Sequence, residues 1–113
     1  MADKTDLLQG TLDLLILKTL SLEPMHGWGI TLRLEQMSGN ALLVNQGSLY
    51  PALERLKRQG VIRWEWRTTA NNRRARYYEL SAAGRKRLAT EREAWRRASG
   101  VVNAILDWAG AVP

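Results

Sequence analysis

The chain has 113 residues, enough for one hydrophobic core but not for two independent ones. Apolar residues make up 45% of it and charged residues 25%, which excludes a disordered chain, while the absence of cysteine excludes disulfides, thiolate nucleophiles and cysteine-ligated zinc. Seventeen Lys and Arg against eleven Asp and Glu give a formal charge of +6, which suits an anionic polymer or an anionic membrane surface, unless it serves solubility alone.

The first predicted helix follows Gly10, with Thr11 as its N-cap and Asp13 in its first turn. It ends at Glu23, because the residue before Pro24 avoids the α region. Its apolar residues keep helical spacing and should face the core: Leu12, Leu15, Ile16 and Leu20. Its apolar runs are far shorter than a membrane span of about 20 residues, and no signal-peptide features are present, so we expect a soluble, cytoplasmic protein without membrane contact.

A second helix is predicted from about His26 to Met37, where the turn formers Ser38, Gly39 and Asn40 end it. The residues expected to face inward are Trp28, Ile30, Leu34 and Met37. The short segment 41–45, "ALLVN", is predicted as a stub strand.

A third helix opens at "QGS", residues 46–48, with Ser48 as its cap, and ends at Gly60. Pro51 is tolerated in its first turn. One face carries an apolar stripe of Leu49, Leu53 and Leu56. The opposite face carries hydrogen-bond donors and positive charge: Gln46, Ser48, Tyr50, Arg55, Lys57 and Arg58.

The segments "VIRWEWR" and "RYYEL" alternate apolar with polar residues, and the turn-rich "TTANNRRA" between them predicts a β-hairpin. Since an isolated hairpin is marginal, it must pack against the helices, with Ile62, Trp64 and Trp66 facing them. Ser81 then caps a long last helix that runs through about Trp108. This order predicts a mainly α fold with a small β-hairpin: a winged helix-turn-helix DNA-binding domain over residues 1–80, followed by a C-terminal dimerisation helix over 81–113.

Nothing in the sequence indicates an enzyme. The single histidine, His26, has no serine, cysteine or carboxylate pair at catalytic spacing and is better explained as a capping or packing residue. No phosphate-binding loop with its lysine occurs, and one histidine cannot form a metal pair. We therefore expect no catalytic residue, no metal and no cofactor.

The amphipathic third helix is typical of a helix-turn-helix reader, whose outer face enters the major groove of double-stranded DNA. Near its N-terminus, Gln46 and Ser48 can bond to bases or backbone, while Tyr50 either offers its hydroxyl to DNA or packs inside. Further along the helix, Lys57 and Arg58 suit phosphates or solvent.

The wing tip adds a cluster of donors that can enter a minor groove, clamp phosphates or merely keep the chain soluble: Asn71, Asn72, Arg73, Arg74 and Arg76. Arg55, on the third helix, is expected to be an ordinary solvated residue. The alternative function is a winged-helix module that binds protein or RNA, but such a module should have a less basic third helix and wing.

Apolar residues of the last helix recur every seven positions and predict a seam that pairs with a second copy: Leu88, Trp95, Val102 and Ala109, with Ala98 and Ile105 between them. Glu91 interrupts the second row. A homodimer would also bind two DNA half-sites at once. The alternative is a helix that folds back onto its own domain.

Three segments resemble the PadR family of bacterial transcriptional regulators and cover nearly the whole chain in the family's order: "LLQGTLDLLILKTLSLEPMHGWGI", "QGSLYPALERLKRQGVI" and "RRARYYELSAAGRKRL". The length resembles the short subgroup, which has a single C-terminal helix. The resemblance implies a dimeric repressor of a palindromic operator, with residues 47–59 as its recognition helix. Its DNA contacts would include Gln46, Ser48, Tyr50, Arg74 and Arg76.

Related members respond to phenolic acids or to hydrophobic drugs, some of which are held at the dimer interface near aromatic residues of the last helix. Trp95 occupies a suitable place for such an effector here. The sequence itself contains no polar constellation that identifies a phenolic ligand, and a tryptophan at the position of Trp95 is more often a core residue than a ligand-binding one.

Overall fold

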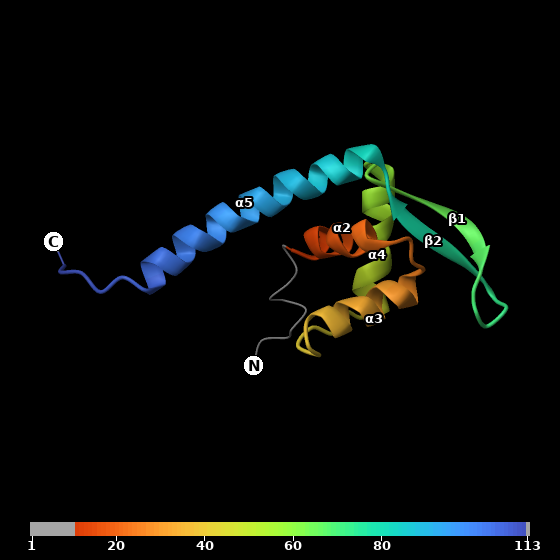
Figure 1. The fold of residues 1–113 in the computed structure, drawn as a ribbon, viewed down its shortest axis with the longest axis horizontal. Helices are drawn as coiled ribbons and strands as arrows, with labels where there is room; N and C mark the ends of the chain where they lie inside the picture. Colours follow the sequence, from red (N-terminus) through yellow and green to blue (C-terminus); the bar gives the residue numbers. More distant parts are fainter. Residues whose placement is uncertain (1–10, 113) are drawn as a thin grey trace.

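The computed structural model describes residues 11–112 (Figure 1). Three helices come first, α2 (Leu12–Leu22), α3 (Gly27–Met37) and α4 (Gln46–Arg58). A hairpin of β1 (Ile62–Thr68) and β2 (Arg74–Leu80) and a long helix, α5 (Ala82–Leu106), follow. The predicted fold, a winged helix-turn-helix with a long C-terminal helix, is confirmed. Across residues 11–112 no helix has both the length and the apolar character that a membrane crossing requires.

The core lies where α2, α3, α4 and the base of the hairpin meet. The apolar stripe of α4 is at its centre, since Leu49, Leu53 and Leu56 are fully buried there. Around it pack Ile16, Leu17 and Leu20 of α2, Ile30 and Leu34 of α3, and Val61, Ile62, Tyr78, Leu80 and Leu88. Helical periodicity therefore predicted the inner face of α4 correctly. For α2 the prediction is right only in part: Ile16 and Leu20 are buried and Leu12 and Leu15 partly so, but Leu17 and Thr19 are also buried.

Side-chain caps fix three of the helix starts. The Nδ1 atom of His26 accepts a hydrogen bond of 2.9 Å from the backbone N–H of Gly29, which confirms the prediction of a capping histidine. The cap of α4 is Asn45 rather than Ser48, because the Asn45 side chain accepts a 2.8 Å bond from the Ser48 N–H. The helix therefore starts earlier than predicted, and Ser48 lies inside its first turn.

The inner face of α3 differs from the prediction. Its buried residues are Gly27, Ile30, Thr31 and Leu34, spaced by three and four residues as one helical stripe requires. Trp28 and Met37 fall outside that stripe and are 57% and 45% exposed. The prediction for Trp28 and Met37 was wrong because a glycine and a threonine, Gly27 and Thr31, occupy buried positions that larger apolar residues usually take.

The stub strand predicted at residues 41–45 does not form. This segment has no regular structure, although Leu42 and Val44 are buried and Leu43 between them is exposed. The position beside β2 is taken instead by Met25, whose N–H and C=O exchange hydrogen bonds of 3.0 and 2.8 Å with Tyr78. The segment 41–45 joins α3 to α4 on the side away from the hairpin, so it does not lie next to either strand (Figure 1).

The hairpin pairs in antiparallel register from Ile62 opposite Leu80 to Thr68 opposite Arg74. Burial fades along it, from buried Ile62 through partly buried Trp64 to Trp66, which is 50% exposed. The prediction that Trp66 packs against the helices is therefore wrong. Figure 1 shows the reason, since the tip of the hairpin extends beyond the helical body.

The first turns of α5 are fixed to the end of α4 and the start of β1. The Ser81 hydroxyl donates a 2.7 Å hydrogen bond to the carbonyl of Gly60 and accepts one of 3.0 Å from the Gly84 N–H. Gly84 is packed so closely that a Cβ there would overlap the carbonyl oxygen of Val61. The helix α5 lies beside α2 as far as Trp95 and Ala98, which line a hollow together with Leu14. Beyond them it extends away from the body in the direction opposite to the hairpin (Figure 1).

Replacing Gly84 with Ala should lower the free energy of unfolding by about 1–3 kcal/mol, because the added methyl group must displace backbone. Gly100, in the same helix, is the matched control, since a Cβ built there meets no described atom within 4 Å apart from its chain neighbours and the adjacent helix backbone. Gly100→Ala should raise the free energy of unfolding by about 0.5–1 kcal/mol through helix propensity. Urea unfolding at one protein concentration measures both, and effects of the same sign would contradict this packing.

Candidate nucleic-acid interface

The N-terminal turn of α4 presents the side chains that were predicted to read bases. Gln46 is partly buried, and its Nε2 atom donates a 3.0 Å hydrogen bond to the Thr31 hydroxyl on α3. This bond holds the amide across the helix-turn-helix and orients it. Ser48 is partly buried as well. Of the polar face of α4, only Tyr50, Lys57 and Arg58 among the predicted DNA contacts are exposed.

Tyr50 is both packed and accessible. Its ring lies against α3, so closely that a Cβ at Gly27 would lie 2.6 Å from the Tyr50 hydroxyl oxygen. Nevertheless, 46% of Tyr50 is exposed. Of the two interpretations of this residue, packing inside or offering its hydroxyl, the geometry leaves the second available.

A hollow of about 340 Å³ separates α3 and α4 from strand β2. Its walls combine aromatic rings with two guanidinium groups: His26, Trp28, Tyr50, Tyr78, Arg74 and Arg76. Burial raises the pKa of the Tyr78 phenol, and the hydrogen bond with Arg76 and its charge oppose that rise. The phenol is therefore neutral near pH 7, and the charge at the hollow is that of the two arginines.

The two faces of the hairpin differ in whether their arginines are paired with carboxylates. On the face that continues the core, no carboxylate in the described part of the chain pairs with Arg74 or Arg76. On the opposite face, Arg63 pairs with Glu79 and Arg67 with Glu65, each at 2.7 Å. Uncompensated positive charge on the hairpin thus lies on the side that faces α4.

The wing turn itself has a structural requirement. Asn72 has a φ of 61°, a left-handed conformation that asparagine tolerates better than most residues. The N–H of Thr69 donates to the carbonyl of Arg73 at 2.7 Å, and the N–H of Asn72 donates to the carbonyl of Thr69 at 2.9 Å, which closes the turn. Asn71, Asn72 and Arg73 are exposed there, and their contacts with DNA stay a prediction.

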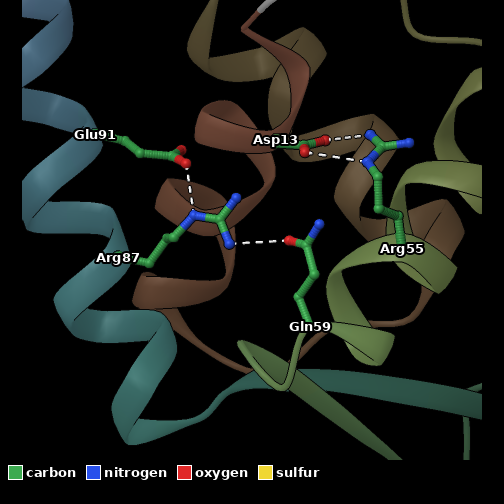
Figure 2. Close-up of polar contacts among 5 residues, drawn as sticks. All are labelled: Asp13, Arg55, Gln59, Arg87 and Glu91. Carbon is green, nitrogen blue, oxygen red and sulfur yellow. Dashed lines mark hydrogen bonds and ion pairs between the residues drawn. The ribbon is translucent and has the colours of Figure 1, made fainter.

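Arg55 faces away from this surface and is more than a solvated residue. Its guanidinium contacts both carboxylate oxygens of Asp13, at 2.5 and 3.3 Å, and so joins α4 to α2 (Figure 2). The hydrogen bond with Asp13 raises the pKa of Arg55 further above its ordinary value. Arg87 of α5 likewise donates to Glu91 at 2.6 Å and to Gln59, at the end of α4, at 2.9 Å. Local spacing does not predict the contacts between helices, Arg55 with Asp13 and Arg87 with Gln59, because the partners are far apart in the chain.

The last helix exposes the seam that was predicted for a second copy. Leu88 lies in the core of its own chain, whereas Trp95 is 52% exposed and Ala98, Val102 and Ile105 are exposed too. Ala109 lies beyond the end of α5. A hollow of about 330 Å³ lined by Leu14, Leu15, Leu88 and Trp95 lies where the seam meets α2.

Among residues 11–112 no three His, Asp or Glu side chains are grouped so that they could hold a metal ion. The hollow beside Tyr50 offers hydrogen bonding, positive charge and aromatic contact. That combination suits recognition of an anionic polymer.

Residues 16–90 match the transcriptional regulator PadR-like family. A PadR-like transcriptional regulator from Bacillus cereus has a similar structure, with a TM-score of 0.80 and 25% identity, covering 92% of this chain and 99% of its own. A PadR family transcriptional regulator from Eggerthella lenta is similar too, with a TM-score of 0.79 and 26% identity, covering 92% of this chain and 88% of its own. An uncharacterized 37.1 kDa transposon protein of Streptomyces fradiae is 37% identical over 79% of this chain, which spans only 24% of that protein. The chain belongs to the PadR-like family of transcriptional regulators.

Proposed function

We propose that the protein is a homodimeric repressor that acts in the cytoplasm by binding a palindromic operator in double-stranded DNA. One observation carries the proposal: Arg74 and Arg76 of β2 lie beside Tyr50 of α4, around one hollow, and have no acidic partners among the described residues. A surface of this charge and shape fits the phosphate backbone beside a groove.

In this proposal the first turn of α4 enters the major groove. Gln46, Ser48 and Tyr50 then reach base edges or nearby phosphates, and the helix N-terminus adds positive potential. Lys57 and Arg58 grip phosphates further along. The wing contributes Asn72, Arg73, Arg74 and Arg76.

The second copy is proposed to pair through α5, so that residues 1–80 bind DNA and residues 81–113 join the protomers. The exposed apolar row on α5 supports this division, because a single small domain leaves it uncovered. A small hydrophobic or phenolic effector held beside Trp95 would release the operator. The apolar hollow under Trp95 supports that site.

Affinity for DNA should fall with salt. A dimer that neutralises about six to ten phosphates gives a slope of roughly −5 to −9 in a plot of log affinity against log salt concentration. Arg74→Ala should make this slope shallower by about one for each phosphate that Arg74 neutralises in the wild-type protein. Arg67→Ala, on the opposite face and already paired with Glu65, should leave it unchanged.

Fluorescence anisotropy with labelled duplex DNA and with single-stranded RNA of mixed sequence measures these slopes. A slope near zero on duplex DNA would exclude the proposed function. Tighter binding to the RNA would favour an RNA-binding module instead.

Gln46→Ala should cost about 1–3 kcal/mol of binding free energy on the operator, recovered by selection from a random pool, and much less on unrelated DNA. Thr31→Val is the matched control, because it removes the partner hydroxyl of Gln46 but keeps the amide and the side-chain shape. If Gln46→Ala loses the same affinity on the operator and on unrelated DNA, Gln46 does not read bases.

Trp95→Glu should dissociate the dimer, because it places an unpaired charge in an apolar seam. Thr90→Glu, exposed on the same helix but outside the apolar row, should leave the dimer intact. Sedimentation velocity distinguishes the two states. A folded, dimeric Trp95→Glu variant would place the pairing surface elsewhere.

A further inference from the structure

One face of the hairpin carries cations and indole rings in alternation. In order from α4 to the wing tip these are Lys57, Trp64, Arg76, Trp66 and Arg74, which we call the tryptophan ladder. The Lys57 Nζ atom lies 5.5 Å from the centroid of Trp64, and the Arg76 Cζ atom lies 4.4 Å from Trp64 and 5.6 Å from Trp66. The Arg74 Cζ atom lies 5.0 Å from Trp66. Each distance is within the range of a cation–π contact.

Strand register produces this arrangement. Residues two apart on a strand point to the same face, so Trp64 and Trp66 on β1 share a face with Arg74 and Arg76 on β2. Trp66 is directly opposite Arg76, and Arg74 is opposite Thr68, nearer the tip. The two indoles meet edge to face, with centroids 5.5 Å apart and planes at 83°. Each arginine therefore meets an indole ring on the partner strand.

The ladder orders its arginines without neutralising them. A carboxylate partner also holds an arginine in place, as Glu65 holds Arg67 on the opposite face, but it cancels the charge. An aromatic ring contacts the flat surface of the guanidinium and leaves the N–H groups at its edge able to donate. Since the ladder arginines have no acidic partner in the described part of the chain, they keep their charge, and Arg76 shares one hydrogen bond with the Tyr78 phenol.

These ordered arginines line the hollow beside Tyr50. We propose that this hollow receives a phosphate of the DNA backbone and that Trp66 is the positioning residue that holds Arg74 and Arg76 toward it. The inference rests on the proposed function and adds a role for a residue that does not itself contact the phosphate. Binding then needs less loss of side-chain freedom, because the long arginine side chains are already ordered before DNA arrives.

The test compares two replacements of Trp66, which is half exposed and so can be changed without disturbing the core. Trp66→Phe keeps an aromatic face, whereas Trp66→Leu keeps only apolar bulk. The probe is a mixed-sequence DNA duplex long enough for two half-sites, and anisotropy is recorded over a range of salt. Trp66→Leu should bind about three- to tenfold more weakly, and Trp66→Phe should stay within about twofold of wild type.

The salt dependence separates positioning from loss of charge. Trp66→Leu should keep the wild-type slope, because both arginines remain charged, whereas Arg76→Ala should make the slope shallower. Arg67→Ala is the matched control on the other face, where the Arg67 Cζ atom lies 5.3 Å from the centroid of the Tyr77 ring. It removes a similar contact from the same hairpin and should leave DNA affinity unchanged. Circular dichroism confirms that each variant is folded.

Three results would overturn the inference while leaving the proposed function intact: unchanged affinity of Trp66→Leu, equal losses in the Leu and Phe variants, or a shallower slope in Trp66→Leu. Equal losses would mean that DNA contacts the indole itself. A wild-type protein that does not bind the duplex at low salt would overturn the proposed function and the inference together.

Discussion

Burial of the leucine stripe of α4 is the constraint on which the rest of the structure depends. Leu49, Leu53 and Leu56 are enclosed by α2, α3 and the start of the hairpin, and each contributes roughly 1.5–3 kcal/mol through burial. Because one helix face is fixed inward, the opposite face must point outward. The direction in which Tyr50 and Lys57 face is thus decided by residues that never contact a partner.

Ion pairs distribute the charge of the protein rather than stabilise it strongly. Surface pairs of this kind contribute about 0–1 kcal/mol each. Their larger effect is to remove free charge from particular places: Arg55 with Asp13, Arg63 with Glu79, Arg67 with Glu65 and Arg87 with Glu91. At the hollow beside Tyr50 the two arginines keep their charge, so the hairpin has one neutralised face and one positive face.

Sequence periodicity predicted the helices, the hairpin and the inner face of α4, because each of these depends on local spacing. It failed where a distant partner decided the outcome. The segment 41–45 forms no strand because it joins α3 to α4 away from the hairpin (Figure 1), and Trp28 faces outward because small residues fill the interface of α3. In the candidate site the sequence predicted the positively charged residues Lys57, Arg74 and Arg76. The rings beneath Arg74 and Arg76 were not predicted, because that stacking appears only once the strand register is known.

The close packing of Gly84 against Val61 fixes the start of α5 to the body, so α5 acts as a rigid arm. Beyond Ala98, which still lies beside α2, the helix continues for about 12 Å, so a tilt of about 10° moves its far end by about 2 Å. In a pair joined through α5, the angle at which the two α5 helices cross would set the distance between the two α4 helices. Under the proposed function, substitutions near Ile105 would change which half-site spacing fits, whereas the base preference proposed for α4 would stay the same.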